Sequence, residues 1–190
     1  MNLKFLDAVL KYRIPVLLFI AAASFALTYY ATRAERDSVG YAPYQPISFS
    51  HKLHAGLMGI DCQYCHTGVE VGRHALIPET QTCMNCHSVA RKDNPQIQKL
   101  TEYYERNIPI PWARIHKVPD YAYFNHSVHV NRGIDCAVCH GDVRNMEIVK
   151  QTKPFTMGDC LSCHRHPEKY MPQLATMVNK GPEHCSACHR

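Results

Sequence analysis

Ten cysteines constrain this chain more than any other feature, because all ten belong to one repeated pattern, Cys-x-x-Cys-His. The pattern occurs five times and leaves no cysteine over. It is the attachment sequence of c-type haem, in which two thiols bond to the haem and the histidine binds its iron. The sequence therefore predicts five covalently bound haem c groups. In chain order, the five motifs are Cys62, Cys65 and His66; Cys83, Cys86 and His87; Cys136, Cys139 and His140; Cys160, Cys163 and His164; and Cys185, Cys188 and His189.

Other uses of paired cysteines explain the pattern less well. Tetrahedral zinc sites take Cys-x-x-Cys pairs two at a time, and five pairs is an odd number. A thioredoxin-like site needs a single pair. A disulfide framework does not require a histidine after every second cysteine. Only haem attachment uses every residue of all five motifs.

Haem attachment has consequences for compartment and fold. The thioether bonds are made after export, so we expect the haem-bearing part to be periplasmic or otherwise extracytoplasmic. The region is short and rich in loops, so it can bury only a weak apolar core of its own. We predict a mainly irregular fold with short α-helices, little sheet and an interior filled by haem.

The N-terminal residues predict a membrane anchor. Nineteen uncharged residues lie between Arg13 and Arg33, which is about the length that crosses a bilayer core. A cleaved signal peptide has a similar composition, but Tyr29 and Tyr30 lie where an interfacial aromatic belt is expected. We expect a retained single-pass anchor in the inner, cytoplasmic membrane, with the N-terminus cytoplasmic. The predicted domains are an anchor (1–32), a linker (33–48) and a haem domain (49–190).

The haem domain contains an internal duplication. Residues 49–87 and 124–164 each begin with Phe-x-His-x-x-His and each contain two haem motifs. The fifth motif, at 185–189, is an addition at the tail. Between the two modules, residues 94–107 predict the clearest soluble helix, with Asn94 as its cap and Pro95 in its first turn.

The two Phe-x-His-x-x-His segments, residues 49–54 and 124–129, predict iron ligands on the distal side of the haems. Histidines at i and i+3 lie on one face of a helix, but the haem that follows them has only one vacant axial position. Two such histidines must therefore serve different irons. We expect His51 to serve the haem of the first motif and His126 that of the third. His54 and His129 then reach haems attached elsewhere.

Five irons accept at most five more ligands, and the sequence offers seven candidates. After the four histidines of the two segments, His116 and His74 are the next candidates. Met146 is the seventh, because it stands between the motifs of the second module as His74 does in the first, and a thioether ligand raises the reduction potential. His166 and His184 lie too close to their own motifs. The distal candidates are His51, His54, His74, His116, His126, His129 and Met146.

The formal net charge of +5 does not predict nucleic-acid binding. Each haem adds two propionates, which offset the positive charge of the chain and of the ferric iron. We therefore expect no nucleic-acid partner.

The repeated frame of Phe-x-His-x-x-His followed by Cys-x-x-Cys-His resembles the cytochrome c3/c7-type multihaem family. The five motifs, the anchor and the stretches at 73–87 and 111–129 further resemble the pentahaem subunits of alternative complex III, a bacterial quinol:electron-acceptor oxidoreductase. This resemblance implies a membrane complex with an iron–sulfur/molybdopterin-like subunit, a monohaem cytochrome c and polytopic membrane subunits. It also implies that this chain relays electrons towards a soluble cytochrome or an oxidase, with quinol bound elsewhere in the complex.

Three functions remain open. An electron-transfer subunit is favoured, because enough distal ligands exist to saturate every iron, and no catalytic site of its own is expected. The alternative is a stand-alone, membrane-anchored quinol dehydrogenase that feeds a periplasmic reductase. A multihaem reductase would need a five-coordinate haem, and the sequence has no variant motif for one.

Overall fold

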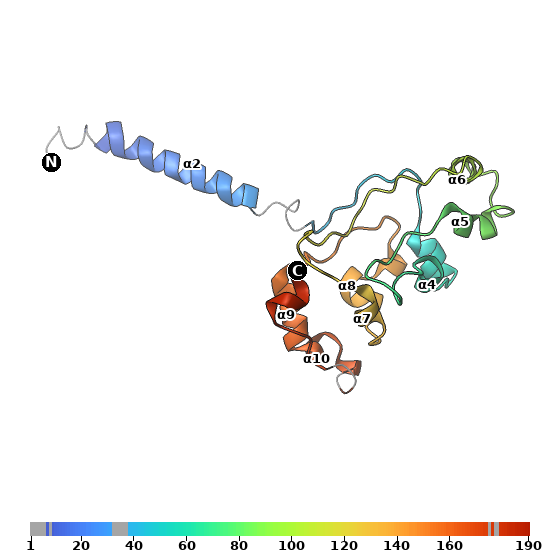
Figure 1. The fold of residues 1–190 in the computed structure, drawn as a ribbon. Coiled ribbons are helices and arrows are strands. Elements are labelled where there is room, and N and C mark those ends of the chain that lie inside the picture. Colours follow the sequence, from blue (N-terminus) through green and yellow to red (C-terminus); the bar gives the residue numbers. More distant parts are fainter. Residues whose placement is uncertain (1–6, 8, 32–37, 175, 177–178) are drawn as a thin grey trace. The chain divides into compact units, whose positions relative to one another are not determined.

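The structure is a computed structural model, and it describes residues 7, 9–31, 38–174, 176 and 179–190. The chain divides into two units, Met1–Asp37 and Ser38–Arg190, which we describe separately. In the first unit, a π-helical turn, η1 (Val9–Arg13), leads into the helix α2 (Ile14–Ala31) (Figure 1). The span Leu10–Ala31 has 22 residues, a mean hydropathy of 1.9 and no buried side chains. Its length and composition are those of a membrane-crossing helix.

The second unit consists of short helices joined by long loops, and the part of it that the structure describes contains no strand (Figure 1). This confirms the predicted fold class. Its helical elements are η2 (Lys52–Leu57), α4 (Cys62–Cys65), α5 (Thr80–His87), α6 (Pro95–Glu105), α7 (His126–Val130), α8 (Cys136–His140), η3 (Val143–Asn145), α9 (Met157–Arg165), α10 (Pro167–Tyr170), η4 (Pro172–Leu174) and α11 (Cys185–Cys188).

The helix α6 is the longest of this unit, and it confirms the helix predicted between the modules. The Asn94 side chain accepts a hydrogen bond from the backbone N–H of Gln96, and Pro95 occupies the first turn. Leu100 faces inward and packs with Ile47 and Met84 in a small apolar cluster. Because Met84 lies in α5, the cluster fastens α6 to the second haem motif.

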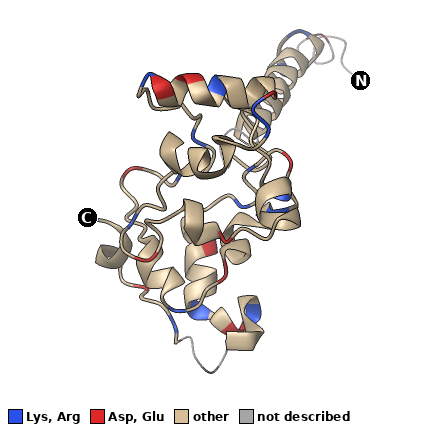
Figure 2. Cartoon of the chain, turned by 90° about the vertical axis from the view of Figure 1, so that its right-hand side faces the viewer, with Lys and Arg blue, Asp and Glu red and all other residues tan. Residues whose placement is uncertain are grey.

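The apolar core is small for a unit of this length. The buried apolar residues among those described are Ile47, Val69, Met84, Leu100 and Met171. Charged residues of both signs are spread over the unit and do not gather in one single-signed region (Figure 2). So little buried side-chain surface is what a fold built around large prosthetic groups requires.

Candidate haem sites

The two cysteines of every motif lie together in one short helix. In α4 and α8 the turn begins at an aspartate whose side chain accepts a hydrogen bond from a backbone N–H, Asp61 from Gln63 at 2.8 Å and Asp135 from Ala137 at 2.7 Å. In α9, Thr156 and Asp159 form a reciprocal capping box. Cysteines at i and i+3 of one turn lie on the same face, as attachment to one haem requires.

Burial shifts the pKa of several of the motif thiols. All ten cysteines are free. Burial raises the pKa of the thiols of Cys83, Cys139 and Cys163. Among the described residues, no group of three or more His, Cys, Asp or Glu side chains is arranged to hold a metal ion. Free thiols paired in this way are available for attachment to haem.

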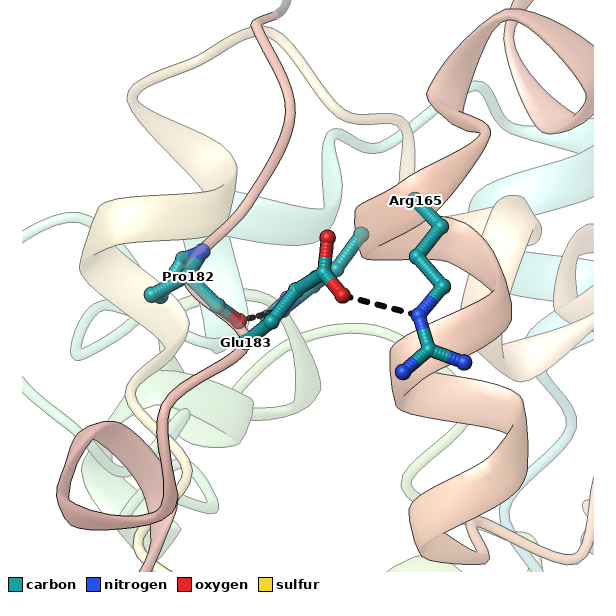
Figure 3. A network of polar contacts seen from close by, with 4 residues as sticks. Arg165, Pro182 and Glu183 are labelled. Carbon is teal, nitrogen blue, oxygen red and sulfur yellow. Dashed lines mark hydrogen bonds and ion pairs between the residues drawn. The ribbon is translucent and has the colours of Figure 1, made fainter.

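Four of the five motif histidines use one ring nitrogen to contact the backbone. The Nδ1 atom of His66 lies 2.7 Å from the carbonyl oxygen of Leu76. That of His164 lies 2.7 Å from the carbonyl oxygen of Pro182 (Figure 3). The corresponding distances are 3.1 Å from His87 to Ala90 and 3.1 Å from His189 to Tyr121. A carbonyl can only accept, so Nδ1 carries the proton in each contact. The other nitrogen, Nε2, is then free to bind iron.

The fourth motif is further fixed by the loop that precedes the fifth. Beside the contact from His164 to Pro182, the Arg165 side chain donates to the Glu183 carboxylate at 2.8 Å (Figure 3). The backbone N–H of Gly181 donates to the carbonyl of His164 at 3.0 Å. Three successive residues, 181–183, therefore position the ligand of the fourth motif.

The two Phe-x-His-x-x-His segments have the same geometry. The Phe49 ring stacks on His54 at 4.4 Å and meets His51 edge-on at 4.8 Å. The Phe124 ring repeats this arrangement, with His129 stacked at 4.6 Å and His126 edge-on at 4.8 Å. In each segment one phenylalanine thus orients two imidazoles at once.

Three of these imidazoles lie opposite motif histidines. The ring centroids are 6.1 Å apart for His54 and His87, 6.3 Å for His126 and His140, and 6.2 Å for His129 and His164. With metal–nitrogen bonds of about 2 Å, the centroids of two axial imidazoles on one iron lie roughly 6 Å apart. Each pair is therefore spaced to hold a single iron.

Each of these three distal histidines also uses its Nδ1 on a backbone carbonyl. The distances are 2.9 Å from His54 to Ser50, 2.7 Å from His126 to Arg73 and 2.7 Å from His129 to Asn125. The nitrogen left over is again Nε2.

The remaining fourth histidine, His51, lies beside the first motif. Burial, followed by the nearby His66, lowers the pKa of His51 to about 4. Burial likewise lowers the pKa of His140 to about 3. Both imidazoles are therefore neutral at neutral pH, which is the form that binds a metal. The Nδ1 of His51 is buried and has no hydrogen-bond partner.

His116 lies against the third motif but not opposite it. Its ring centroid is 4.4 Å from that of His140 at an angle of 81°, which is too close for both rings to bind one iron. Burial lowers the pKa of His116, and its Nε2 is buried without a hydrogen-bond partner. A buried, neutral and unpaired ring nitrogen is what a ligand needs, so His116 stays a candidate for another iron.

The other sequence candidates are placed differently. His74 is exposed. Met146 is half-buried beside η2, where its carbonyl oxygen accepts from the N–H of Lys52 at 3.0 Å. His166 is exposed and lies 3.3 Å from the Glu168 carboxylate, and His184 is exposed.

Neighbouring thiols show how the motifs follow one another in space. Burial raises the pKa of the Cys83 thiol, and the nearby Cys65 thiol raises it further. The first and second motifs therefore lie side by side. Asn85 also donates to the Tyr64 hydroxyl at 3.0 Å across this junction. Burial and then Cys62 raise the pKa of Cys136 to about 11, and the two side chains are hydrogen-bonded. The first motif therefore stands between the second and the third.

The later motifs continue the series. Burial raises the pKa of Cys139, and Cys163 of the fourth motif adds to the effect. Burial and then Cys188 of the fifth motif raise the pKa of Cys160. The motifs thus form a row in the order second, first, third, fourth, fifth.

Sequence reasoning missed two kinds of residue at these sites. The phenylalanines stood in the repeated frame, but nothing in the sequence assigns their rings to both histidines. The carbonyl acceptors of Leu76, Pro182 and Tyr121 carry no sequence signal, because every residue has a carbonyl group.

Comparison with known proteins finds that two parts of the chain are similar to cytochrome c families. Residues 28–108 match the model of the class III cytochrome c family, and residues 122–190 match that of cytochrome c7 and related cytochromes c. A curated relative from Nitratidesulfovibrio vulgaris (strain Hildenborough) is 29% identical over 77% of this chain and 77% of its own length. That protein is described as the multihaem cytochrome c subunit of a menaquinone reductase.

Proposed function

We propose that this chain, two parts of which match the models of class III and c7-type cytochromes c, is the membrane-anchored, five-haem electron relay of a quinone-linked respiratory complex. Covalent haem c supplies reversible one-electron chemistry at iron when it is bound. The chain's own residues hold the irons, fill their axial positions and set the path.

One observation carries the proposal: the three pairs of imidazoles spaced for a single iron each. An iron with two protein ligands has no vacant position for a substrate, so it transfers electrons and does not bind a reactant. The pairs are His54 with His87, His126 with His140 and His129 with His164. We therefore assign electron transfer to the chain and no catalytic site.

The duplication suggests a rule for the axial ligands. In the second module, His126 faces the first haem motif of its own module, and His129 faces the second. In the first module, His54 likewise faces its module's second motif. By the same rule we assign His51 to the first motif. For the iron of the fifth motif, His116, His74 and Met146 remain the candidates.

The row of motifs suggests the path. We propose that electrons pass between the second motif at one end and the fifth at the other, with the first, third and fourth between them. The exchange with partner proteins then takes place at the two ends of this row.

Two kinds of complex use such a chain, and they differ in direction. The relative belongs to a menaquinone reductase, whereas alternative complex III oxidises quinol. We propose that this chain assembles with an iron–sulfur/molybdopterin-like subunit, a monohaem cytochrome c and polytopic membrane subunits, as in alternative complex III. The acceptor is then a soluble cytochrome or a terminal oxidase. A stand-alone quinol dehydrogenase remains the second candidate, because α2 has the length and composition of a helix that could anchor the chain without partners.

Gentle detergent extraction tests the assembly. We expect the haem-stained protein to copurify with polytopic membrane subunits and an iron–sulfur subunit, identified by mass spectrometry. Reduction of the purified complex by a quinol would support the alternative complex III assignment. Reduction of quinone by an electron donor to the complex would favour the reductase type. A stable monomer that quinol reduces directly would replace the complex by the stand-alone dehydrogenase.

A further inference from the structure

Two arginine side chains share one aromatic ring between the third and fifth motifs. The guanidinium carbon of Arg73 lies 3.9 Å from the ring centroid of Tyr123, and that of Arg190 lies 5.1 Å from it. Both distances are within the range of cation–π contacts. The ring attracts both cations, but it does not remove the repulsion between them.

Neither arginine has a carboxylate partner in the part of the chain that the structure describes. The ion pairs found there join Arg106 to Glu102, Arg165 to Glu183 and His166 to Glu168. Moreover, the Nε of Arg73 is buried and has no hydrogen-bond partner. A buried donor on a charged group is costly when it is unpaired, so this site needs an anionic acceptor.

The position of the two arginines indicates which anion. The carbonyl oxygen of Arg73 accepts from Nδ1 of His126, the imidazole opposite His140. On the other side, the N–H of Tyr123 donates to the carbonyl of Cys188 at 2.5 Å. The pair therefore lies between ligand residues of the third and fifth motifs. Each haem carries two carboxylates, which makes haem propionate the nearest available anion.

We propose that Arg73 and Arg190, held against Tyr123, form a carboxylate site for haem propionate, and that Arg73 binds a propionate of the haem on the third motif. This inference rests on the proposed haem function. A guanidinium paired with the propionate offsets its negative charge. Without that cation, the remaining carboxylate favours the ferric iron, so the reduction potential of this haem falls.

Potentiometry of the full-length, five-haem protein in detergent tests the site. The variants are Arg73→Gln, which removes the charge, and Arg73→Lys, which keeps it. Arg132→Gln serves as the control, because Arg132 is an exposed arginine of the module that contains the third motif. Electron paramagnetic resonance follows the titration, and the signal of the third-motif haem is identified as the one that His126→Ala removes.

We expect Arg73→Gln to lower the midpoint potential of that signal, Arg73→Lys to lower it less, and Arg132→Gln to leave it unchanged. Unchanged potentials in Arg73→Gln would overturn the inference, as would a shift confined to the haem of the fifth motif. A shift seen only in phosphate buffer and lost in phosphate-free buffer would show a free anion and overturn the propionate assignment.

A haem count separates this inference from the proposed function. Five haems per chain in wild type and in all variants would show that the cofactors are bound, so an unchanged potential would count against the Arg73 site alone. A wild-type protein that binds no haem would overturn the proposed function itself.

Discussion

At the scale of single residues, one contact recurs at the candidate haem sites: Nδ1 of an imidazole donates to a backbone carbonyl. His66, His126 and His164 each make it at 2.7 Å. The contact fixes both the tautomer and the rotation of the ring, so the ligand is oriented before iron binds. Residues that contribute only a backbone carbonyl thereby orient the imidazole ligands.

Gly181 is the sharpest example. A Cβ at this position would lie 2.5 Å from Cγ of His164, whose ring cannot move aside without leaving its place opposite His129. We expect Gly181→Ala to destabilise the protein by about 1–3 kcal/mol, in the range of overpacked sites, and to alter the low-spin signal of the fourth-motif haem. Thermal unfolding and electron paramagnetic resonance measure the two effects.

Gly158→Ala is the matched control for this substitution. Gly158 lies in α9, the helix that contains His164, and its added Cβ would meet Thr156 Oγ1 at an ordinary 3.6 Å. Alanine also favours a helix over glycine. We expect no loss of stability and no spectral change, and equal effects of the two substitutions would contradict the steric account.

At the scale of elements, each Phe-x-His-x-x-His segment joins two haem sites of its own module. The segment at 124–129 provides His126 on α7 for the third motif and His129 for the fourth. A helical turn with one phenylalanine against both rings therefore fixes the relative positions of two imidazoles that face different motifs.

The angles between paired imidazoles predict two kinds of ferric signal. The planes of His126 and His140 differ by 5°, and those of His54 and His87 by 63°. Nearly parallel rings split the iron d orbitals strongly and give a rhombic low-spin signal, whereas crossed rings leave them close in energy and give a signal with a large maximum g value. We expect electron paramagnetic resonance of the oxidised protein to show both.

Substitution assigns the two signals. His54→Ala is expected to remove the large-g signal and spare the rhombic ones. His126→Ala is expected to remove the rhombic signal of its own pair and to spare that of His129 and His164, whose planes differ by 24°. Loss of the same signal in both variants would contradict the assigned pairs. Mass spectrometry of each variant shows whether the covalent haems are retained.

At the scale of the whole molecule, the haem motifs themselves take the place of a core. Few apolar side chains are buried among the described residues. One cluster of them, around Leu100, packs α5 and α6 together with Ile47. The motifs lie next to one another in a row: Cys62 and Cys163 lie close enough to raise the pKa of thiols in the third motif. Cys188 of the fifth motif likewise raises the pKa of Cys160 in the fourth.

Removal of a haem should therefore lower the stability of the unit more in the middle of the row than at its end. We expect Cys136→Ser with Cys139→Ser to lower the thermal midpoint and helix content strongly, because two junctions lose their filling. Cys185→Ser with Cys188→Ser is expected to leave the other four haems bound and the unit folded. Circular dichroism and haem counting compare them, and equal losses would argue against the row.

We expect residues 1–37 to anchor the chain and the second unit to bind its haems without them. Replacing residues 1–37 by a cleavable export signal is expected to give a protein that leaves the membrane fraction, with its haems still attached. Absorbance spectra and cell fractionation measure this. Retention of the truncated protein in washed membranes would mean that partner subunits, and not α2 alone, hold the chain at the bilayer.

How well the sequence predicts a feature depends on how far apart in the chain the residues that form it lie. The fold class and the helix at α6 were predictable and are confirmed, because capping residues, periodicity and scarce apolar residues act locally. The pairs of facing imidazoles could not be predicted from the sequence. His54 and His87 are joined only by the folded chain, and the sequence left seven candidates for five positions.

By itself, the sequence determined which residues stand in attachment motifs, where an apolar span lies and that histidines outnumber the motifs. These features rest on spacings of a few residues, which a helical turn converts directly into geometry. Only the tertiary structure decided which imidazoles face each other, in what order the motifs stand, and that Arg73 lies with Arg190 at one ring. Those relations depend on how distant loops pack, which no local pattern specifies.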